Sequence, residues 1–176
     1  MRLGLKRNEV RLVPHNQEWI EEFLRVKKDI VRETRLEPYR IEHIGSTAIR
    51  GIEAKPIIDI LIGIDNLDYI EDALFKGLKK TGFLRLKVIR EAEIVLAKFT
   101  DDSFEEKTHF IHLVEYQGRK WTDLIFFRDY MNSNELARKE YEEIKKSFVR
   151  HKQEGINEYT AKKESFVNKI CALNKE

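Results

Sequence analysis

The residues best suited to chemistry lie in one short stretch, where a glycine and two hydroxyl residues precede a carboxylate. Gly45 lets the backbone turn sharply with a positive φ, a conformation that other residues resist. Ser46 and Thr47 then begin a short helix, whose free N–H groups and dipole favour a phosphate. Asp59 follows within an apolar run. Together these residues predict a site that binds a phosphate and its counterion.

Asp59 is the most unusual residue of this stretch, because it lies inside the apolar run of residues 57–64. An ionised carboxylate there costs desolvation energy unless a partner or a ligand compensates its charge. A magnesium ion, which prefers carboxylates, waters and substrate phosphates, would satisfy Asp59. Lys55 would contact the same phosphates or simply neutralise Asp59. The alternative is structural, with Asp59 at a strand end and paired with a lysine or with backbone amides.

Two cations farther along the chain have two interpretations each. Arg128 either forms an ion pair with Asp129 that fixes a helix, or clamps a phosphate with its planar guanidinium. Lys163 lies on an otherwise apolar helical stripe, where a lysine usually extends its ammonium group to solvent. Beside Tyr159 it would also reach a nucleotide. The structural interpretation is favoured for both residues.

The strands that must position these residues follow from the apolar pattern. Residues 39–44 alternate in polarity and predict a strand that ends at Gly45. Residues 56–64 are nearly continuously apolar and rich in β-branched residues, as in a central strand buried on both faces. Further strands are expected at residues 83–88, 93–100 and 110–115, the first two forming a hairpin around residues 89–91.

Apolar residues at helical spacing predict helices before, between and after these strands. The first covers about residues 16–33, and the second has Asp65 as its cap and ends near Gly82. A short helix is expected around residues 121–128. Two longer helices follow, with apolar stripes at Ala137, Tyr141, Ile144 and Phe148 and then at Tyr159, Lys163, Phe166 and Ile170.

The composition indicates one globular domain over residues 1–176, of the α/β (α+β) class. Hydrophobic residues make up 41% and charged residues 36%, which supports a packed core and argues against disorder. The net charge of +2 gives no general attraction to nucleic acids, so any anion site is local. The single cysteine, Cys171, forms no intramolecular disulfide. Without a signal-peptide pattern or a membrane span, we expect a cytoplasmic protein that is a monomer or a homodimer.

The chain resembles the GrpB family, whose signature is matched by EHIGSTAIRGIEAKPIIDILIGI at residues 42–64. Further matches in the family's order are Leu12 to His15, Trp19, Phe127 to Tyr130, Tyr141, Lys145, Tyr159, Thr160 and Lys163. That family is placed in the nucleotidyltransferase superfamily. The resemblance therefore implies a nucleotidyltransferase-like mixed β-sheet flanked by helices, with a helical C-terminal part.

The sequence departs from the superfamily pattern at its second acid. That pattern combines a Gly-Ser turn with an Asp-x-Asp strand and a third acid on a later strand, whereas Leu61 stands two residues after Asp59. The usual pair of metal-binding carboxylates is thus incomplete. His112, which shares a strand face with Phe110 and Val114, is either a metal or acid–base group or a hydrogen-bonded core residue. The available substitutes are Glu42 and His43 before the turn, and His109, His112 and Glu115 where the third ligand is expected.

The candidate site can be stated residue by residue. The catalytic candidates are Asp59, His112 and Glu42. The phosphate-binding candidates are Gly45, Ser46, Thr47, Lys55, Arg128 and Lys163. The candidate metal ligands are Asp59 and His112.

Two functions fit this set. The first is an enzyme that binds a nucleoside triphosphate and magnesium and transfers a nucleotidyl group to an unknown acceptor. The second is a module that binds a nucleotide or another phosphate ligand without efficient chemistry, as the missing second acid favours. Some GrpB-like domains are joined to a dephospho-coenzyme A kinase, so the resemblance implies a link to coenzyme A or adenine nucleotides. The chain has no G-x-x-x-x-G-K-[ST] loop and is not that kinase. A protein-interaction partner is a third, weaker interpretation.

Overall fold

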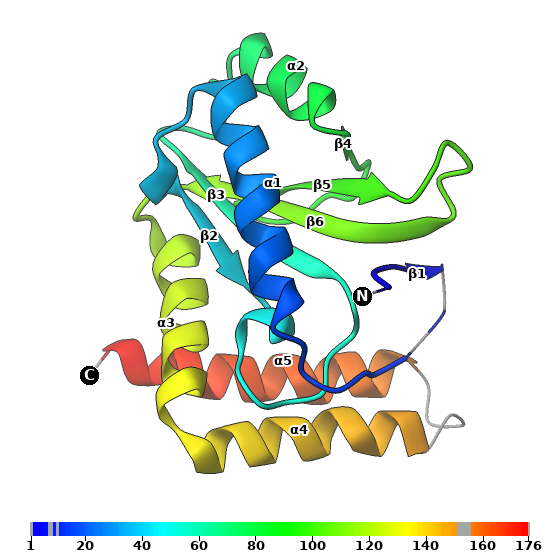
Figure 1. Cartoon of the computed structure of the whole chain (residues 1–176). Coiled ribbons are helices and arrows are strands. Elements are labelled where there is room, and N and C mark those ends of the chain that lie inside the picture. Colours follow the sequence, from blue (N-terminus) through cyan, green and yellow to red (C-terminus); the bar gives the residue numbers. More distant parts are fainter. Residues whose placement is uncertain (1, 7–8, 10, 151–155, 176) are drawn as a thin grey trace.

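The chain folds into a mixed β-sheet flanked by helices (Figure 1). This computed structural model describes residues 2–6, 9, 11–150 and 156–175, and for residues 148–150, 156–161 and 175 it describes the backbone alone. Within those residues the strands are β1 (Leu5–Lys6), β2 (Ile41–Ile44), β3 (Ile58–Ile64), β4 (Phe83–Arg85), β5 (Ile94–Phe99) and β6 (Glu106–Glu115). The α-helices are α1 (Glu18–Thr34), α2 (Asp72–Lys80), α3 (Arg119–Ser133), α4 (Glu135–Arg150) and α5 (Ile156–Ala172). Short 3₁₀ turns lie at Pro38–Arg40, Ser46–Ala48 and Leu173–Lys175.

A parallel pair of strands forms the centre of the sheet. β3 lies parallel to β6, and antiparallel pairings complete the order β2-β3-β6-β5-β4, with β1 paired to the beginning of β6. In the parallel pair Asp59 is level with Phe110, and Leu61 is level with His112. Because side chains alternate along a strand, Asp59, Leu61 and His112 point to the same face of the sheet.

Apolar clusters cover the two faces of this sheet. On one face, α1 buries Trp19 and Ile30 against Ile60 of β3 and its neighbours. On the other face, Trp121 of α3 packs against Leu61. Asp59 therefore lies on the face that α3 covers, and not on the face that α1 covers.

The last two helices pack beside the sheet, against the loop between β2 and β3. Tyr141 of α4 and Phe166 of α5 contact Ile49 and Ile52 of that loop, together with Phe127 of α3. Figure 1 shows α4 and α5 running side by side next to one end of α3. The helical C-terminal part thus holds the loop that carries the glycine turn.

The bounds of several elements differ from the prediction. β6 begins at Glu106 and not near residue 110, and α3 has 15 residues where a short helix was expected. α2 begins at Asp72, so Asp65 as its cap is wrong. The carboxylate of Asp65 instead forms an ion pair with Arg40 at 2.8 Å. The two-residue strand β1 was missed, because so short a segment carries no periodic signal.

The structure describes only some side chains of the two apolar stripes predicted in the C-terminal helices. Ala137, Phe166 and Ile170 are buried as expected, in the cluster that joins α3, α4 and α5. The predicted apolar positions Phe148 and Tyr159 lie outside the described side chains.

The helix expected after Gly45 is only one 3₁₀ turn. Gly45 has a φ of 72°, as predicted, and Ser46–Ala48 complete the turn. Since a single turn has little dipole, the predicted helix dipole is wrong as a source of phosphate affinity. Two donors remain, because within the described chain the backbone N–H groups of Ser46 and Thr47 have no hydrogen-bond partner.

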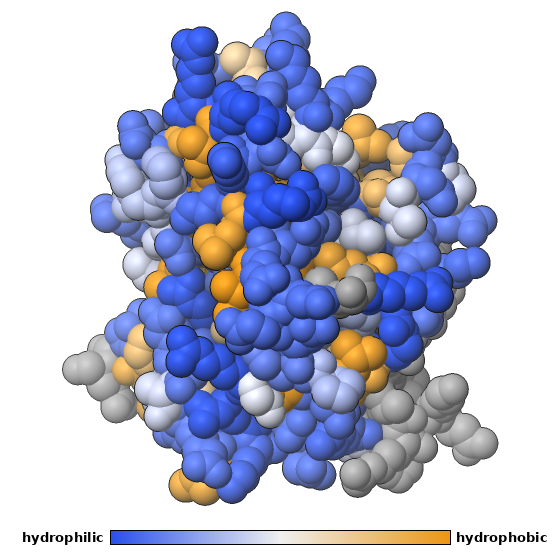
Figure 2. All heavy atoms as spheres, viewed as in Figure 1, coloured by the Kyte–Doolittle hydropathy of each residue, from blue (hydrophilic) through white to orange (hydrophobic). Residues whose placement is uncertain are grey.

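The surface of the molecule is mainly charged and polar. Figure 2 shows hydrophilic residues over most of the visible face, with apolar residues in small separate groups. None of the described helices has both the length and the apolar character needed to cross a membrane.

Replacing Gly77 by alanine is expected to destabilise the fold, although alanine is the better helix former. A Cβ atom at position 77 would lie 2.6 Å from the backbone oxygen of Glu33, where α2 packs on α1. We expect Gly77→Ala to lower the free energy of unfolding by about 1–3 kcal/mol in urea unfolding. Lys76→Ala, at an exposed position of the same helix, is the control. A Gly77→Ala protein as stable as the control would contradict this helix contact.

Candidate functional site

Asp59 faces the glycine turn, as the sequence interpretation requires. It lies opposite Ile44 in the β2–β3 pairing, and Gly45 is the next residue. A Cβ atom built on Gly45 would collide with Oδ2 of Asp59, so only glycine fits at position 45. The side chain of Asp59 is 28% exposed. The carboxylate and the turn therefore form one partly open site.

His112 connects Asp59 to a second carboxylate inside the protein. Its Nε2 lies 3.3 Å from Oδ1 of Asp59, and its Nδ1 lies 2.5 Å from Oε1 of Glu93. The side chain of His112 is 17% exposed, whereas that of Glu93 is only 1% exposed. The three side chains form a chain of hydrogen bonds that runs from the turn into the sheet.

The two carboxylates keep His112 positively charged at neutral pH. Burial lowers the pKa of the imidazole, but the hydrogen bonds to Asp59 and Glu93 outweigh burial and raise this pKa to about 9. Burial also raises the pKa of Glu93, and its hydrogen bonds to His112 and Lys120 more than reverse that effect and bring it to about 2. An imidazolium thus stands between the carboxyl groups of Asp59 and Glu93.

Glu93 has further cationic partners that compensate its burial. Nζ of Lys120 lies 2.6 Å from its Oε2, and a guanidinium nitrogen of Arg90 lies 3.4 Å from its Oε1. The sequence interpretation missed Glu93 and Lys120. Glu93 lies two residues before Val95, which is level with His112 in the β5–β6 pairing, so the sequence reveals this partner only once that pairing is known. Period two places Glu93 on the same face as His112.

Asp59 and His112, the predicted metal ligands, bind each other. Both ring nitrogens of His112 face carboxylate oxygens, and a protonated imidazole has no lone pair for a metal. Among the described residues, no group of three or more His, Cys, Asp or Glu side chains is arranged to hold a metal. The side chains of the described site therefore do not fit a magnesium ion held by several carboxylates.

Three lysines form a second group of charged residues near the turn. The predicted residues Lys55 and Lys163 are joined there by Lys145 of α4, which is 2% exposed and donates a hydrogen bond to the backbone oxygen of Glu53. Burial first, and then the charge of Lys163, lowers the pKa of Lys145 to about 7. The same two causes lower the pKa of Lys55. Since the charge of Lys163 acts on both, the three ammonium groups lie in one neighbourhood.

The two hydroxyl residues of the turn have different surroundings. Ser46 faces α4, where its Oγ lies 3.4 Å from the hydroxyl oxygen of Tyr141. Thr47 is buried, its hydroxyl donates to the backbone oxygen of Ile57, and it lies 3.0 Å from Nε2 of His43. The hydroxyl of Thr47 is therefore engaged within the protein, where it fixes the turn, and the predicted contact of Thr47 with a phosphate would be made by its backbone N–H.

Glu42 and Arg128 bind each other and do not contact Asp59. Glu42 is level with Leu61, not with Asp59, and its Oε2 accepts a hydrogen bond of 2.6 Å from Arg128. Arg128 also donates to Asp129 at 2.7 Å and to the backbone oxygen of His43 at 3.0 Å. The ion-pair interpretation of Arg128 describes these contacts, and the structure does not bring Glu42 to the carboxylate of Asp59.

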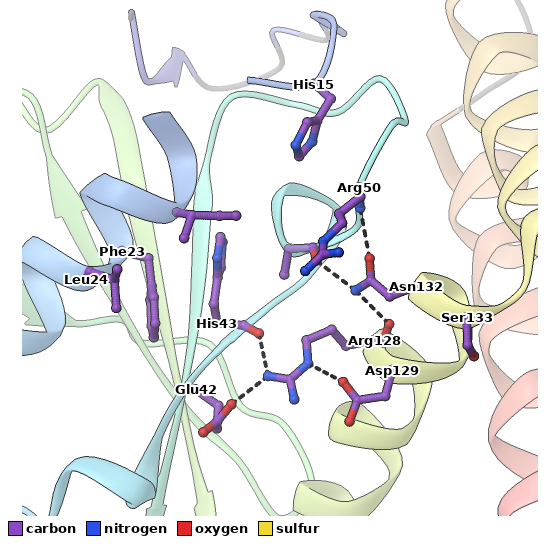
Figure 3. A pocket seen from close by; sticks show the side chains of 12 residues that line it. His15, Phe23, Leu24, Glu42, His43, Arg50, Arg128, Asp129, Asn132 and Ser133 are labelled. Atoms are coloured by element: carbon purple, nitrogen blue, oxygen red, sulfur yellow. Dashed lines mark hydrogen bonds and ion pairs between the residues drawn. The ribbon is translucent and has the colours of Figure 1, made fainter. Parts of the chain in front are cut away.

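This pair lines a cavity of about 520 Å³ along the edge strand β2 (Figure 3). The N-terminal half of α1 forms one wall, and the C-terminal end of α3 forms the other. Asn132 of α3 donates to the backbone oxygen of Ala48 and accepts from the backbone N–H of Arg50. The cavity thus borders the 3₁₀ turn at Ala48, and its described lining includes none of Lys55, Lys145 and Lys163.

The other substitutes named from the sequence have structural surroundings. His43 lies on the α1 face, where its ring stacks on Phe23 at 4.8 Å. His109 is buried on that face beside Glu22, and burial lowers its pKa to about 4. Glu115 is exposed at the end of β6. Of the histidines in β6, only His112 joins the site of Asp59.

Comparison with known proteins gives a consistent result for nearly the whole chain. The family model described as GrpB protein matches residues 9–173. The glutamate-rich protein GrpB of Alkalihalophilus pseudofirmus is 41% identical over 169 residues, which cover 96% of this chain and 97% of that protein. The UPF0157 protein YqkA of Bacillus subtilis is 27% identical over 92% of this chain and 46% of its own length.

More distant similarities concern an enzyme and a solved structure. The dephospho-CoA kinase of Mycobacterium tuberculosis is 25% identical, with 91% of this chain and 44% of the kinase covered. The crystal structure of the conserved protein GrpB from Enterococcus faecalis superposes with a TM-score of 0.76 at 21% identity, covering 94% of this chain and all of that one. At this identity the superposition shows the fold alone.

We predict that the contribution of His112 to stability disappears at alkaline pH. Its pKa is about 9 in the folded protein and 6.5 ordinarily, so the contribution is complete below about 6.5 and is lost as the pH rises through about 9. The difference in unfolding free energy between the wild type and His112→Gln should shrink across that interval in urea unfolding. A difference that stays constant would refute the charged state of His112.

A second prediction concerns Glu93. Glu93→Gln should lower the pKa of His112, because it removes the carboxylate at Nδ1. Titration of the imidazole ring followed by NMR measures this pKa. Arg90→Gln, which removes only the more distant partner of Glu93, should change it less. Equal effects of the two substitutions would mean that Glu93 is not the group that holds His112.

Proposed function

The chain belongs to the GrpB family, and on that premise we propose that it binds a small molecule carrying a phosphate group, with nucleotides as the first candidates. The phosphate would lie at the turn of residues 45–47. It would contact the backbone N–H groups of Ser46 and Thr47 and the ammonium groups of the neighbouring lysines.

The crowding of Lys55, Lys145 and Lys163 is the observation that carries this proposal. Like charges repel, and burial of Lys145 lowers its pKa to about 7. Three ammonium groups in one neighbourhood would attract an anion, in addition to the carboxylates of Asp59, Glu53 and Glu142, whose charges already act on Lys55 and Lys145. Because the net charge of the chain is only +2, this local concentration is a property of the site and not of the whole surface.

The charges around Asp59 support binding that does not depend on a metal. The imidazolium of His112 compensates Asp59, while Lys120 and Arg90 compensate Glu93. Asp59 therefore does not require a divalent cation before a phosphate can approach. Because the described side chains do not fit a magnesium ion, phosphate binding at the turn would rely on the protein's own donors and cations.

Nucleotidyl transfer is the second candidate, because Asp59 faces the turn and is 28% exposed. In the pattern of the nucleotidyltransferase superfamily, which the sequence resemblance implies, Asp59 would be the first acid, and Leu61 stands where the second acid would be. The similarity to dephospho-CoA kinases covers 44% of those enzymes, and it makes dephospho-coenzyme A a ligand to test beside the nucleoside triphosphates.

Calorimetric titration tests the proposal with ATP, CTP, GTP, UTP and dephospho-coenzyme A, each with magnesium and with EDTA. We expect at least one of them to bind in EDTA. Lys145→Met should weaken that binding by about tenfold or more, as for the loss of one charge-assisted hydrogen bond. Lys139→Met, which removes an exposed lysine of the same helix, is the matched control and should bind normally.

The outcomes separate the two candidate functions. Binding without turnover supports the proposed function. Release of pyrophosphate that needs magnesium and disappears in Asp59→Asn would instead support nucleotidyl transfer. A folded wild-type protein that binds none of these ligands would refute both candidates.

Anion affinity should also decrease as the pH rises above about 7. The pKa of Lys145 is about 7 without a ligand, and a bound anion favours the charged ammonium. Below this pKa the group is already charged, whereas above it binding must take up a proton, so the affinity falls by up to about tenfold per pH unit. Sulfate, whose charge is constant in this range, is a suitable probe. The decrease should be absent in Lys145→Met, and a pH-independent wild type would contradict the role of Lys145.

A further inference from the structure

The cavity along β2 has an apolar wall formed by α1. Ile20, Phe23 and Leu24 lie on this wall, and Leu24 is 55% exposed. The ring of Phe23 stacks on the imidazole of His43 with an angle of 13° between the planes. Burial lowers the pKa of His43 to about 4, so the ring is uncharged at neutral pH. This side of the cavity therefore offers a neutral, largely apolar surface.

The opposite side carries one uncompensated cation. Arg128 is neutralised, because it pairs with both Glu42 and Asp129. The guanidinium of Arg50, by contrast, has no carboxylate within ion-pair distance among the residues that the structure describes. Figure 3 shows the side chain of Arg50 extending into the cavity between His15 and Arg128.

The position of Arg50 is fixed from outside the cavity. The backbone N–H of Arg50 donates to Oδ1 of Asn132 at 3.0 Å. The side-chain amide of Asn132 in turn donates to the backbone oxygen of Ala48. The charge of Arg50 also contributes to lowering the pKa of His15, after burial, so His15 is a neutral polar group of the same cavity. The backbone of Arg50 is therefore held, and its exposed side chain brings a positive charge to the cavity.

We propose that this cavity is a second ligand site, which binds a small monocarboxylate with its carboxylate on Arg50 and its apolar body on the α1 wall. The volume of about 520 Å³ is within the usual range for small-molecule sites. A single guanidinium matches a carboxylate in charge and in its planar, two-pronged geometry. A more highly charged anion is disfavoured, because Glu42 and Asp129 lie on the same cavity.

The proposal does not depend on phosphate binding at the lysines. The described lining of the cavity includes Arg50 but neither Ser46 nor any of Lys55, Lys145 and Lys163. Inorganic phosphate and a carboxylate should therefore affect different sets of residues. This difference allows each site to fail or succeed without the other.

Benzoate is the probe for the cavity, and benzyl alcohol is its uncharged counterpart. In ¹H–¹⁵N NMR spectra, benzoate should give saturable shifts at Phe23, Leu24 and Asn132, and benzyl alcohol should bind about tenfold more weakly or worse. Inorganic phosphate, added separately, reports on Ser46 and Lys145. Shifts confined to Ser46 and Lys145 with benzoate would overturn the proposal.

Two substitutions test the charge and the wall. Arg50→Gln should weaken benzoate binding by about tenfold or more, and Leu24→Glu, at an exposed position, should do the same by placing a negative charge beside the ligand. Arg119→Gln removes an exposed arginine outside this cavity and should leave the binding unchanged. Equal affinity of the wild type and Arg50→Gln, or of benzoate and benzyl alcohol, would overturn the proposal, as would the absence of saturable shifts.

Discussion

The parallel pairing of β3 with β6 is the contact on which the candidate site depends. Its register places Leu61 level with His112 and so brings Asp59 within 3.3 Å of the imidazole on one face of the sheet. Because side chains alternate with a period of two, a slip of one residue would turn Asp59 towards the apolar residues under α1. The apolar residues that alternate with Asp59, such as Ile58 and Ile60, fix this register by their burial on the opposite face.

The charges of Asp59, His112, Glu93, Lys120 and Arg90 compensate one another only when all five side chains are in place. Glu93 is 1% exposed and is ionised because His112, Lys120 and Arg90 surround it. Removing one partner of a buried ion pair leaves an uncompensated charge, which typically costs about 3–5 kcal/mol. His112 is therefore held in its charged form by the fold itself. This explains how a carboxylate is tolerated in an otherwise apolar strand.

The sequence predicts those parts of the site that depend on local pattern. The strand containing Asp59, the positive φ of Gly45 and the helices α1 and α4 all follow from composition and period. The partners of His112 and the position of Glu42 do not follow, because they depend on which strands become neighbours. Nothing in the spacing of Glu93 and Lys120 indicates that the residue before β5 forms an ion pair with α3. The helix dipole was overestimated, because the sequence does not determine how soon the turn after Gly45 ends.

The turn after Gly45 is rigid because each of its side chains or carbonyls has a different partner. Thr47 is fixed towards the core through Ile57 and His43, and Ala48 is fixed towards α3 through Asn132. Within the described chain the backbone N–H groups of Ser46 and Thr47 have no hydrogen-bond partner, and the hydroxyl of Ser46 faces Tyr141 of α4. A ligand there would not have to order the loop, so less of its binding energy is spent on conformational entropy. Asn132 also accepts a hydrogen bond from the backbone N–H of Arg50, so one side chain of α3 fixes the chain at Ala48 and again at Arg50, beside the cavity.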